Sequence, residues 1–455
     1  MRPLIRSVGR LGQAVVAGCF VFFDINYEID YKLSNFYFGV GTIGIRKGAK
    51  EEESMTIKSI FDQKISRASF IRKAPAALAA AGAVSTLGLG ATVPAAAEET
   101  KPGYYGVPRT WIWNPNANSM VDTSKWKKEG PYTIGFSNAS ISNAWRVAFQ
   151  HGVFWAAGQH RDEIAHLLAT DANDDPSKQI ADIQDLISQG VDVLLIAAAT
   201  EDALDSVVGR AMEQGIPVIM VDRKVKTASN YITYITASDW ALGRLEALWL
   251  CETLGGKGNI VMLPGIAGSS VAEIRIKANE EVFGKFPGIK VLEKQYCDWN
   301  PATGKSVMAA LIQKHGKEIN GVLADSALQG SGAIQAFLAA GYKDGEIPPM
   351  TGGDIALMYQ LASQHNIKMV GIDYPTSMGI TGIETVLDVM KGIPVPEKVE
   401  VSFNVVTSPG ADTVSVKGDR HLLDHVSMSD PGDLSPSNGL PAGYNPSTFK
   451  PDYPK

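Results

Sequence analysis

The chain has 455 residues, which is enough for two or three domains, and its 45% hydrophobic and 20% charged residues are ordinary for a soluble globular protein. A formal net charge of −6 at pH 7 argues against a nucleic-acid-binding surface, which is normally basic. No run of about 20 apolar residues is free of polar interruption, so the sequence shows no segment typical of a membrane-spanning helix.

The N-terminal part of the chain carries the pattern of an export signal. Basic residues between positions 64 and 73 precede a stretch of small apolar residues from Ala74 to Val93, and Ala95-Ala96-Ala97 then fits an A-x-A cleavage site. We therefore predict a signal peptide over residues 55–97, cleavage near Ala97 and a periplasmic mature protein. General secretion is favoured over the twin-arginine route because the basic region has no adjacent arginine pair.

Residues 1–54 are aromatic and irregular, and they precede Met55, which itself begins a complete signal. We interpret them as a non-native or untranslated extension upstream of the true start. A competing interpretation is that Val16-Ala17-Gly18-Cys19 resembles a lipoprotein acceptor site, although the apolar stretch before Cys19 is short and Gln13 interrupts it.

Residues 98–130 follow the signal as an aromatic leader rich in Tyr and Trp. Such side chains usually pack onto a domain surface, and a partner-binding patch is the alternative.

Only Cys251 and Cys297 remain in the mature chain. They could form one disulfide in an oxidising compartment, while two small buried hydrophobic side chains are the simpler interpretation.

From Pro131 onward, strand-like and helix-like segments alternate. The strands of the first series are predicted at 132–137, 164–169, 191–196 and 218–221, with a short edge strand at 234–236. Its helices are predicted from about 143, over 176–189 and before Gly215. The buried apolar run Val218–Val221 ends directly on Asp222-Arg223. Because ligands of open α/β sheets bind outside the carboxyl ends of the strands, this charged pair stands where a ligand would bind.

A second series begins after a glycine-rich stop at 255–258. It is predicted as strands at 259–263, 290–296, 321–324, 350–352 and 368–372, with helices at 270–283, 301–315, 332–340, 355–365 and 377–390. A further helix, predicted at 239–254, ends at the glycine-rich stop. Alternation in each half implies a parallel sheet with right-handed crossovers, and hence two lobes with a cleft between them. After about Ser408 the pattern fails, so the proline-rich tail is predicted to be extended, partly disordered or wrapped along a lobe surface.

Several motifs occur in order between Pro131 and Val406. They are Asn173-Asp174-Asp175-Pro176 with the helix that follows, PVIMVDR ending at Arg223, Thr236-Ala237-Ser238-Asp239, GIAGSSVAEIR ending at Arg275, Asp298-Trp299-Asn300 and Gly352-Gly353-Asp354. Together they resemble the ribose-type periplasmic sugar-binding proteins of ABC importers. The resemblance implies the type I periplasmic binding protein fold, in which two Rossmann-like α/β lobes are joined by a multi-strand hinge and the ligand lies in the interlobe cleft.

The resemblance also implies a domain plan and a set of ligand-binding positions. The N-terminal lobe would comprise 131–237 with 374–402, the C-terminal lobe 238–373 with 403–415, and the tail 416–455. The ligand-binding residues would be Asn143, Trp145, Arg146, Asp222, Arg223, Arg275, Trp299, Ser326, Asp354 and Asp373, with Ala139 nearby.

This set of side chains suits a polyhydroxyl ligand. Carboxylates accept hydrogen bonds from hydroxyls, guanidiniums donate in pairs, and indole faces cover the C–H face of a ring. The charges roughly cancel, which favours a neutral ligand. Arg146 stands where a second aromatic is expected, and Ser326 and Asp373 replace amide-type residues, so a polyol, another pentose or a hexose fits as well as ribose.

Simpler structural roles remain open for several of these residues. Asp222 and Arg223 could form a surface ion pair, Trp145 and Trp299 could be ordinary core, and Asp354 could cap the helix after it. Arg275 lies within a helix pattern and could be solvated, and Arg146 could equally have no role in binding. The glycines between 328 and 332 fit close helix–strand packing better than a phosphate site.

The resemblance implies an extracytoplasmic solute-binding protein that captures a neutral monosaccharide or polyol and delivers it to the membrane permease of an ABC importer. It would act as a monomer without a cofactor, metal or nucleic acid. A sensory module that presents its liganded form to a chemoreceptor or histidine kinase is the alternative. A repressor of this fold would need a helix-turn-helix before Pro131, and none is evident.

Enzyme signatures give no support for catalysis, since HExxH, a Walker loop, a nucleophile elbow and CxxC are all missing from the sequence. His421 and His425 have the spacing of a helical metal-binding pair. They lie in a tail with few other ligands, so a metal site there is not favoured.

Overall fold

The computed structural model describes residues 42–47, 51–56, 119–422, 427–430, 432–433 and 435. The predicted cleavage site, the leader up to residue 118 and His425 lie outside the described residues. In a unit of its own, residues 1–95 contain the strands β1 (Thr42–Lys47) and β2 (Glu51–Thr56), which pair as an antiparallel hairpin. All other described elements belong to the second unit, residues 96–455.

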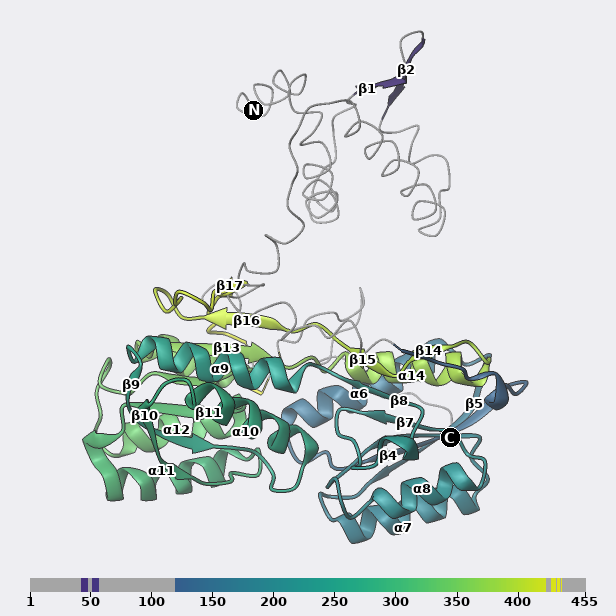
Figure 1. The fold of residues 1–455 in the computed structure, drawn as a ribbon. Coiled ribbons are helices and arrows are strands. Elements are labelled where there is room, and N and C mark those ends of the chain that lie inside the picture. Colours follow the sequence, from purple (N-terminus) through teal and green to yellow (C-terminus); the bar gives the residue numbers. More distant parts are fainter. Residues whose placement is uncertain are drawn as a thin grey trace. The chain divides into compact units, whose positions relative to one another are not determined.

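The N-terminal lobe is a parallel sheet covered by helices on both faces. Within the described residues its strand order is β15-β8-β7-β6-β4-β5 (Figure 1). The strands are β4 (Tyr132–Asn138), β5 (Ile164–Asp171), β6 (Val193–Ala197), β7 (Val218–Val221), β8 (Thr233–Thr236) and β15 (Lys398–Glu400), and the helices are α6 (Ala144–Gln159), α7 (Pro176–Ser188), α8 (Asp205–Glu213) and α14 (Met378–Met390). The prediction of an edge strand at 234–236 is wrong, because β15 pairs outside β8.

The C-terminal lobe repeats this plan. Its described strands follow the order β10-β9-β11-β12-β13-β16-β17, and β16 runs antiparallel to β13. The strands are β9 (Lys257–Leu263), β10 (Gly288–Lys294), β11 (Gly321–Ala324), β12 (Met350–Gly352), β13 (Met369–Asp373), β16 (Asn404–Thr407) and β17 (Arg420–His421), and the helices are α9 (Asp239–Thr253), α10 (Ser270–Phe283), α11 (Pro301–His315), α12 (Ala327–Ala339) and α13 (Ala356–Gln364). The predicted two-lobed α/β fold is confirmed.

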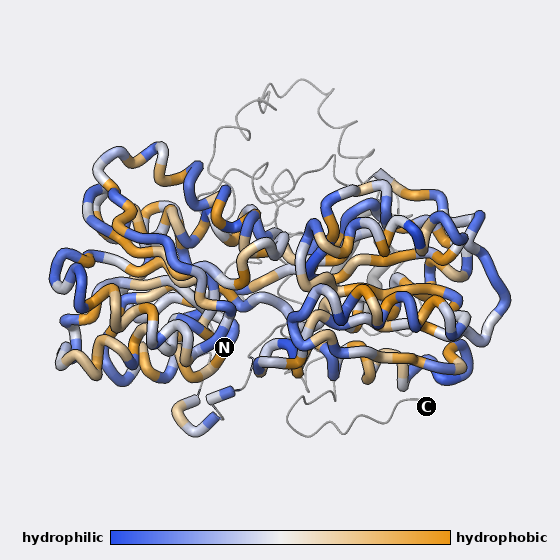
Figure 2. Tube along the Cα trace, turned by 90° about the horizontal axis from the view of Figure 1, so that it is seen from below, coloured by the Kyte–Doolittle hydropathy of each residue, from blue (hydrophilic) through white to orange (hydrophobic). Residues whose placement is uncertain are grey.

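Three segments carry the chain between the lobes. They lie between β8 and α9, between β13 and α14, and between β15 and β16. Figure 2 shows these crossings in the middle, with apolar residues concentrated in the interior of each lobe. The exact lobe boundaries stay a prediction, but a hinge of several strands follows from these crossings.

Local sequence signals explain where several helices begin. The side chain of Asn143 accepts a hydrogen bond from Arg146 N and caps α6, and Asp175 caps α7 directly before Pro176. Asn300 does the same for α11, again followed by proline. These caps satisfy backbone N–H groups that a helix cannot pair internally, and they place the adjacent loops at the carboxyl ends of the strands.

Helix α12 begins at Ala327, five residues before the predicted start at 332, and is capped by the Ser326 hydroxyl. A Cβ on Gly332 would overlap the carbonyl oxygen of Pro301 in α11, and one on Gly304 would overlap the backbone of Gln329. The glycines therefore allow α11 and α12 to approach closely. We expected these glycines to allow close packing of a helix against a strand, but they allow close packing of two helices. The contact between α11 and α12 outweighs the weak helix propensity of glycine.

The described parts of the predicted leader and of the segment after Ser408 pack onto the lobes. The structure describes residues 119–130 of the predicted leader. In this segment Trp126 packs against the core, and Lys128 N donates a 2.9 Å hydrogen bond to Met390 O. The described tail includes β17 and Ala411, whose carbonyl accepts a 2.7 Å hydrogen bond from Trp249 Nε1. In both segments, packing along a lobe surface is the interpretation that agrees with the structure.

The cysteines Cys251 and Cys297 are both free and buried, so the disulfide interpretation is wrong and the simpler one holds. Burial raises the pKa of each thiol to about 12.

Among the described residues, no helix is long and apolar enough to span a membrane, and no group of three or more His, Cys, Asp or Glu side chains could hold a metal ion.

Candidate ligand-binding site

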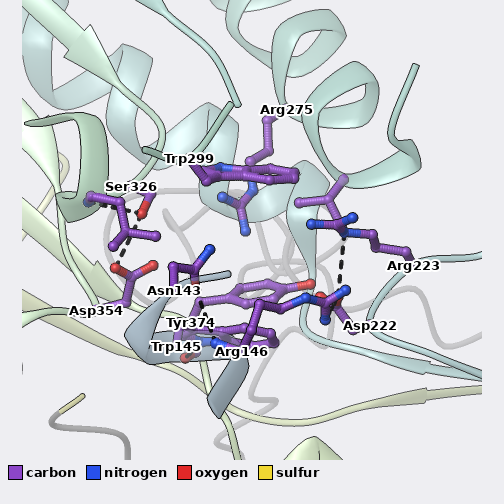
Figure 3. A pocket seen from close by; sticks show the side chains of 12 residues that line it. Asn143, Trp145, Arg146, Asp222, Arg223, Arg275, Trp299, Ser326, Asp354 and Tyr374 are labelled. Atoms are coloured by element: carbon purple, nitrogen blue, oxygen red, sulfur yellow. Dashed lines mark hydrogen bonds and ion pairs between the residues drawn. The ribbon is translucent and has the colours of Figure 1, made fainter. Parts of the chain in front are cut away.

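The strand ends of the two lobes enclose a cavity with about 350 Å³ of empty space, including its mouth. Its lining residues are Asn143, Trp145, Arg146, Asp222, Arg223, Val271, Arg275, Trp299, Ser326, Leu328, Asp354 and Tyr374 (Figure 3). Every residue predicted from the sequence except Asp373 is among them.

These residues come from the loops at the carboxyl ends of the strands and from the helices α6, α10 and α12 that follow such loops. Asp222 follows β7, Asp354 follows β12, and Trp299 lies between β10 and α11. All three have a left-handed backbone, with φ of 62°, 70° and 47°. Non-glycine residues rarely adopt this conformation, and the cost for a bulky residue such as Trp is highest. The strained turns aim these side chains into the cleft.

Aromatic rings form two opposite walls of the cavity. Figure 3 shows Trp299 on one side and Trp145 with Tyr374 on the other, with Asn143 between them. Trp299 Nε1 donates to Asp325 Oδ1 at 3.0 Å, and Trp145 Nε1 donates to the Tyr374 carbonyl at 2.9 Å. Because the protein already satisfies both indole N–H groups, the rings present apolar faces to a ligand.

The N-terminal lobe contributes a buried charged cluster. Asp222 accepts a 2.7 Å hydrogen bond from Arg146 Nη1, and Arg223 Nη1 donates to Asp174 at 3.3 Å. Asp222 and Arg223 are 4% and 3% exposed, so the surface ion-pair interpretation does not apply to them, and Arg146 is 1% exposed. Burial, together with the charge of Arg223, lowers the pKa of Arg146 to about 10, so it stays protonated at neutral pH.

Arg146 has unused hydrogen-bonding capacity. Its Nε and Nη2 atoms are buried and have no partner among the described residues. These two N–H groups lie on one edge of the guanidinium, where they can donate in parallel to two neighbouring oxygens. An unpaired buried donor on a charged group is costly, so a ligand with adjacent oxygen acceptors would relieve this cost.

The C-terminal lobe contributes one cation and one carboxyl group to the cavity. Arg275 is 2% exposed and donates from Nη1 to the Asp325 carbonyl at 2.7 Å. Asp354 accepts a 3.2 Å hydrogen bond from Ser326 Oγ, and burial raises its pKa well above the ordinary value. Asp354 does not cap α13, which begins after Ile355 without a side-chain cap, so that alternative is wrong.

Asp373 is not part of the cavity lining. As the last residue of β13, it accepts a 2.7 Å hydrogen bond from Tyr359 Oη of α13. The next residue, Tyr374, lines the cavity instead, because side chains alternate between the two faces of a strand. Val271 and Leu328 were also not predicted. The strand-end rule that selected Asp222 would have selected Tyr374, since it directly follows a buried apolar strand.

The lobes also meet at the rim of the cleft. Glu201 N donates to the Gly268 carbonyl at 3.0 Å, and Lys224 N donates to Ser270 Oγ at 3.1 Å. Inside the cleft, the Arg223 guanidinium lies 4.8 Å from the centre of the Trp299 ring. These contacts join the two lobes on the side opposite the hinge, so the structure is a closed conformation.

Comparison with known proteins places the fold in a family. The family model of the periplasmic binding protein domain matches residues 134–394, more than half of the chain. The galactofuranose-binding protein of Escherichia coli is 34% identical over 221 residues, covering 48% of this chain and 69% of that protein. The ribose import binding protein of Bacillus subtilis is 27% identical over 281 residues, covering 62% of this chain and 88% of that protein.

Two further proteins widen the comparison. The xylitol-binding protein of Mycolicibacterium smegmatis is 35% identical over 175 residues, which cover 38% of this chain and half of that protein. The solved fructose-binding periplasmic domain of a hybrid two-component system is 28% identical, with a TM-score of 0.57 over 62% of this chain and 92% of that one. All four are named as binding proteins or domains, and the predicted resemblance is confirmed: the chain belongs to the periplasmic binding protein family.

Proposed function

We propose that this protein captures a neutral monosaccharide or polyol outside the cytoplasm and delivers it to the permease of an ABC importer. The observation that carries this proposal is the closed interlobe cavity, whose aromatic walls are surrounded by buried guanidinium and carboxyl groups. Flat apolar faces suit the C–H surface of a sugar ring, and the charged groups suit its hydroxyls.

The charge balance around the cavity supports a neutral ligand. Three guanidiniums line it together with the carboxyl groups of Asp222 and Asp354. Asp174 and Asp239 also lie within hydrogen-bonding distance of two of these arginines. The cations are therefore matched by carboxylates that the protein itself supplies, so the cavity holds no uncompensated positive charge for an anionic ligand to neutralise.

The proposed ligand class agrees with the names of the relatives, which bind galactofuranose, ribose, xylitol and fructose. Their periplasmic location supports export of this chain, with a signal peptide over 55–97 that is cleaved near Ala97. We further propose that the mature protein is a monomer that binds its ligand unchanged, with no cofactor.

A screen of pentoses, hexoses and polyols by thermal shift and calorimetry tests the ligand class. A ligand that binds only the native state raises the melting temperature in proportion to ln(1 + [L]/Kd). We expect one or a few neutral compounds to raise it by several degrees. A response to amino acids or nucleosides, with none to any carbohydrate, would overturn the proposal.

A sensory role is the second candidate, because the similar fructose-binding domain belongs to a hybrid two-component system. Both roles use the same cavity and the same closed form. Deleting the gene separates them: a transport role predicts loss of labelled-sugar uptake, whereas a sensory role predicts normal basal uptake and loss of sugar-induced transcription.

A further inference from the structure

We infer that Asp239 is a positioning residue that couples the hinge between the lobes to the ligand cavity by holding Arg275 and Tyr374 in place. This inference rests on the proposed sugar-binding function and deepens it. Asp239 does not line the cavity. It is the first residue of α9, it directly follows the first crossing between the lobes, and it is 3% exposed.

The carboxylate of Asp239 receives hydrogen bonds from two directions. On one side, Oδ1 accepts a 3.0 Å bond from Arg275 Nε, in α10 of the C-terminal lobe. On the other side, Oδ2 lies 3.3 Å from both Thr236 Oγ1 and Tyr374 Oη. Those two hydroxyls are 2.9 Å apart, so one donates to the other, and the second donates to the carboxylate.

The three partners lie at different parts of the molecule. Thr236 ends β8 of the N-terminal lobe, and Tyr374 begins the second crossing, directly after β13 of the C-terminal lobe. Asp239 therefore ties the first crossing to the second and both of them to Arg275. A rotation of one lobe against the other changes backbone angles in these crossings, so it must also move the groups bound to Asp239.

Two of these partners reach the ligand cavity directly. The Arg275 guanidinium lies 4.5 Å from the centre of the Tyr374 ring, and both side chains line the cavity. With Nε bound to Asp239 and Nη1 bound to the Asp325 carbonyl, the orientation of the Arg275 guanidinium is fixed from two sides. Asp239 thus prepares a donor and an aromatic wall for the ligand without touching it.

The charge of Asp239 is held at a cost. Burial, with a smaller contribution from the neighbouring Asp222, raises its pKa to about 6 against the opposing effect of Arg275. Lys398 of β15 lowers it, and Tyr234 of β8 also faces the carboxylate. Because the folded pKa lies above the ordinary value of 3.8, ionised Asp239 lowers stability at neutral pH, and this cost declines as the pH falls from about 6 toward 3.8.

The substitution Asp239→Asn tests the inference because it keeps the shape and removes the charge. Asparagine can still accept from Arg275 and pair with a hydroxyl, and the buried guanidinium keeps the nearby charge of Asp325, so we expect an essentially unchanged melting temperature without ligand. Replacing the carboxylate acceptor of this ion pair by a neutral amide oxygen should weaken sugar binding by about fivefold or more at pH 7.5. A merely structural residue would lower affinity and stability together.

The pH profile adds a second readout. The ratio of variant to wild-type Kd should fall toward one between pH 7.5 and pH 5, because protonated wild-type Asp239 resembles asparagine. Other groups that titrate in the cavity, such as Asp354, are present in both proteins. Their effects on Kd therefore cancel when the variant Kd is divided by the wild-type Kd. Asp344→Asn, on the exposed surface beside His365, is the matched control and should leave the Kd unchanged.

A double-mutant cycle with Tyr374→Phe, which keeps the ring and removes only Oη, completes the test. The effect of Tyr374→Phe should shrink when Asp239 is already Asn, because both changes break the same network. A Kd within twofold of wild type for Asp239→Asn, a ratio that does not depend on pH, or additive effects would overturn the inference. Failure of the wild-type protein to bind any sugar would instead refute the proposed function.

Discussion

The sharpest test of the ligand cavity is the removal of the Asp222 carboxylate. Asp222 lines the cavity and accepts the 2.7 Å hydrogen bond from Arg146, while Arg223 Nε lies 3.6 Å from the same oxygen. The substitution Asp222→Asn keeps the shape, and Asp222→Ala removes the acceptor altogether. Both leave the two guanidiniums without their shared counter-ion.

The expected magnitude follows from the contacts. A hydrogen bond to a charged group contributes about 1.5–3 kcal/mol, and every 1.4 kcal/mol is about tenfold in Kd. Losing one such bond to a sugar hydroxyl should therefore weaken binding about 10- to 100-fold for either variant. Asp222→Ala should also destabilise the fold by about 3–5 kcal/mol, because removing one partner of a buried ion pair leaves uncompensated charge.

Calorimetry at pH 7.5 with the sugar identified in the screen measures the affinity, and thermal unfolding without ligand measures the stability. Asp182→Asn, which changes an ion pair with Lys178 on the outer face of α7, is the matched control and should behave as wild type. If Asp222→Asn binds within twofold of wild type and melts normally, Asp222 does not contact the ligand and the assigned cavity is wrong.

Four further outcomes are expected. Trp299→Ala should weaken sugar binding by about tenfold or more in calorimetry, whereas Trp299→Phe, which keeps an aromatic face, should weaken it less. Ser270→Ala should raise the dissociation rate of the sugar about two- to tenfold in stopped-flow measurements, since it removes the acceptor for Lys224 N at the cleft rim. Gly332→Val should lower the free energy of unfolding by more than about 3 kcal/mol in urea titrations, because its side chain would overlap α11. Cys251 and Cys297 should resist alkylation in the native protein at pH 8 and react only after unfolding, because both thiols are buried and have raised pKa values.

The sequence predicted the features of this fold that depend on local chemistry. Capping residues and prolines marked the starts of α7 and α11, and uniformly apolar runs marked β7 and β11. The position of Asp222 after such a run was enough to place it at the cavity, since strand ends of one parallel sheet meet at one edge.

The features that the sequence did not reveal depend on distant parts of the chain. The pairing of β15 with β8 joins segments more than 150 residues apart, so nothing near Tyr234 indicated that β8 has a neighbour on both sides. The start of α12 depends on contact with α11. The glycines permit this contact, but their presence in the sequence does not predict it. At the end of β13, a shift of one residue exchanged Asp373 for Tyr374, because neighbouring side chains face opposite sides of a strand.

The closed cleft also explains why ligand and closure should depend on each other. In the closed cleft Arg146 is desolvated, and its Nε and Nη2 atoms find no partner in the described part of the protein. Without a ligand this desolvation opposes closure, and the rim contacts of Glu201 and Lys224 supply only ordinary neutral hydrogen bonds against it. A ligand with adjacent hydroxyl oxygens satisfies Arg146 and fills the space between the aromatic walls, so it binds the closed form far better than the open one. That difference in affinity is what a ligand needs in order to shift a conformational equilibrium, and an apolar molecule of the same size could not supply it.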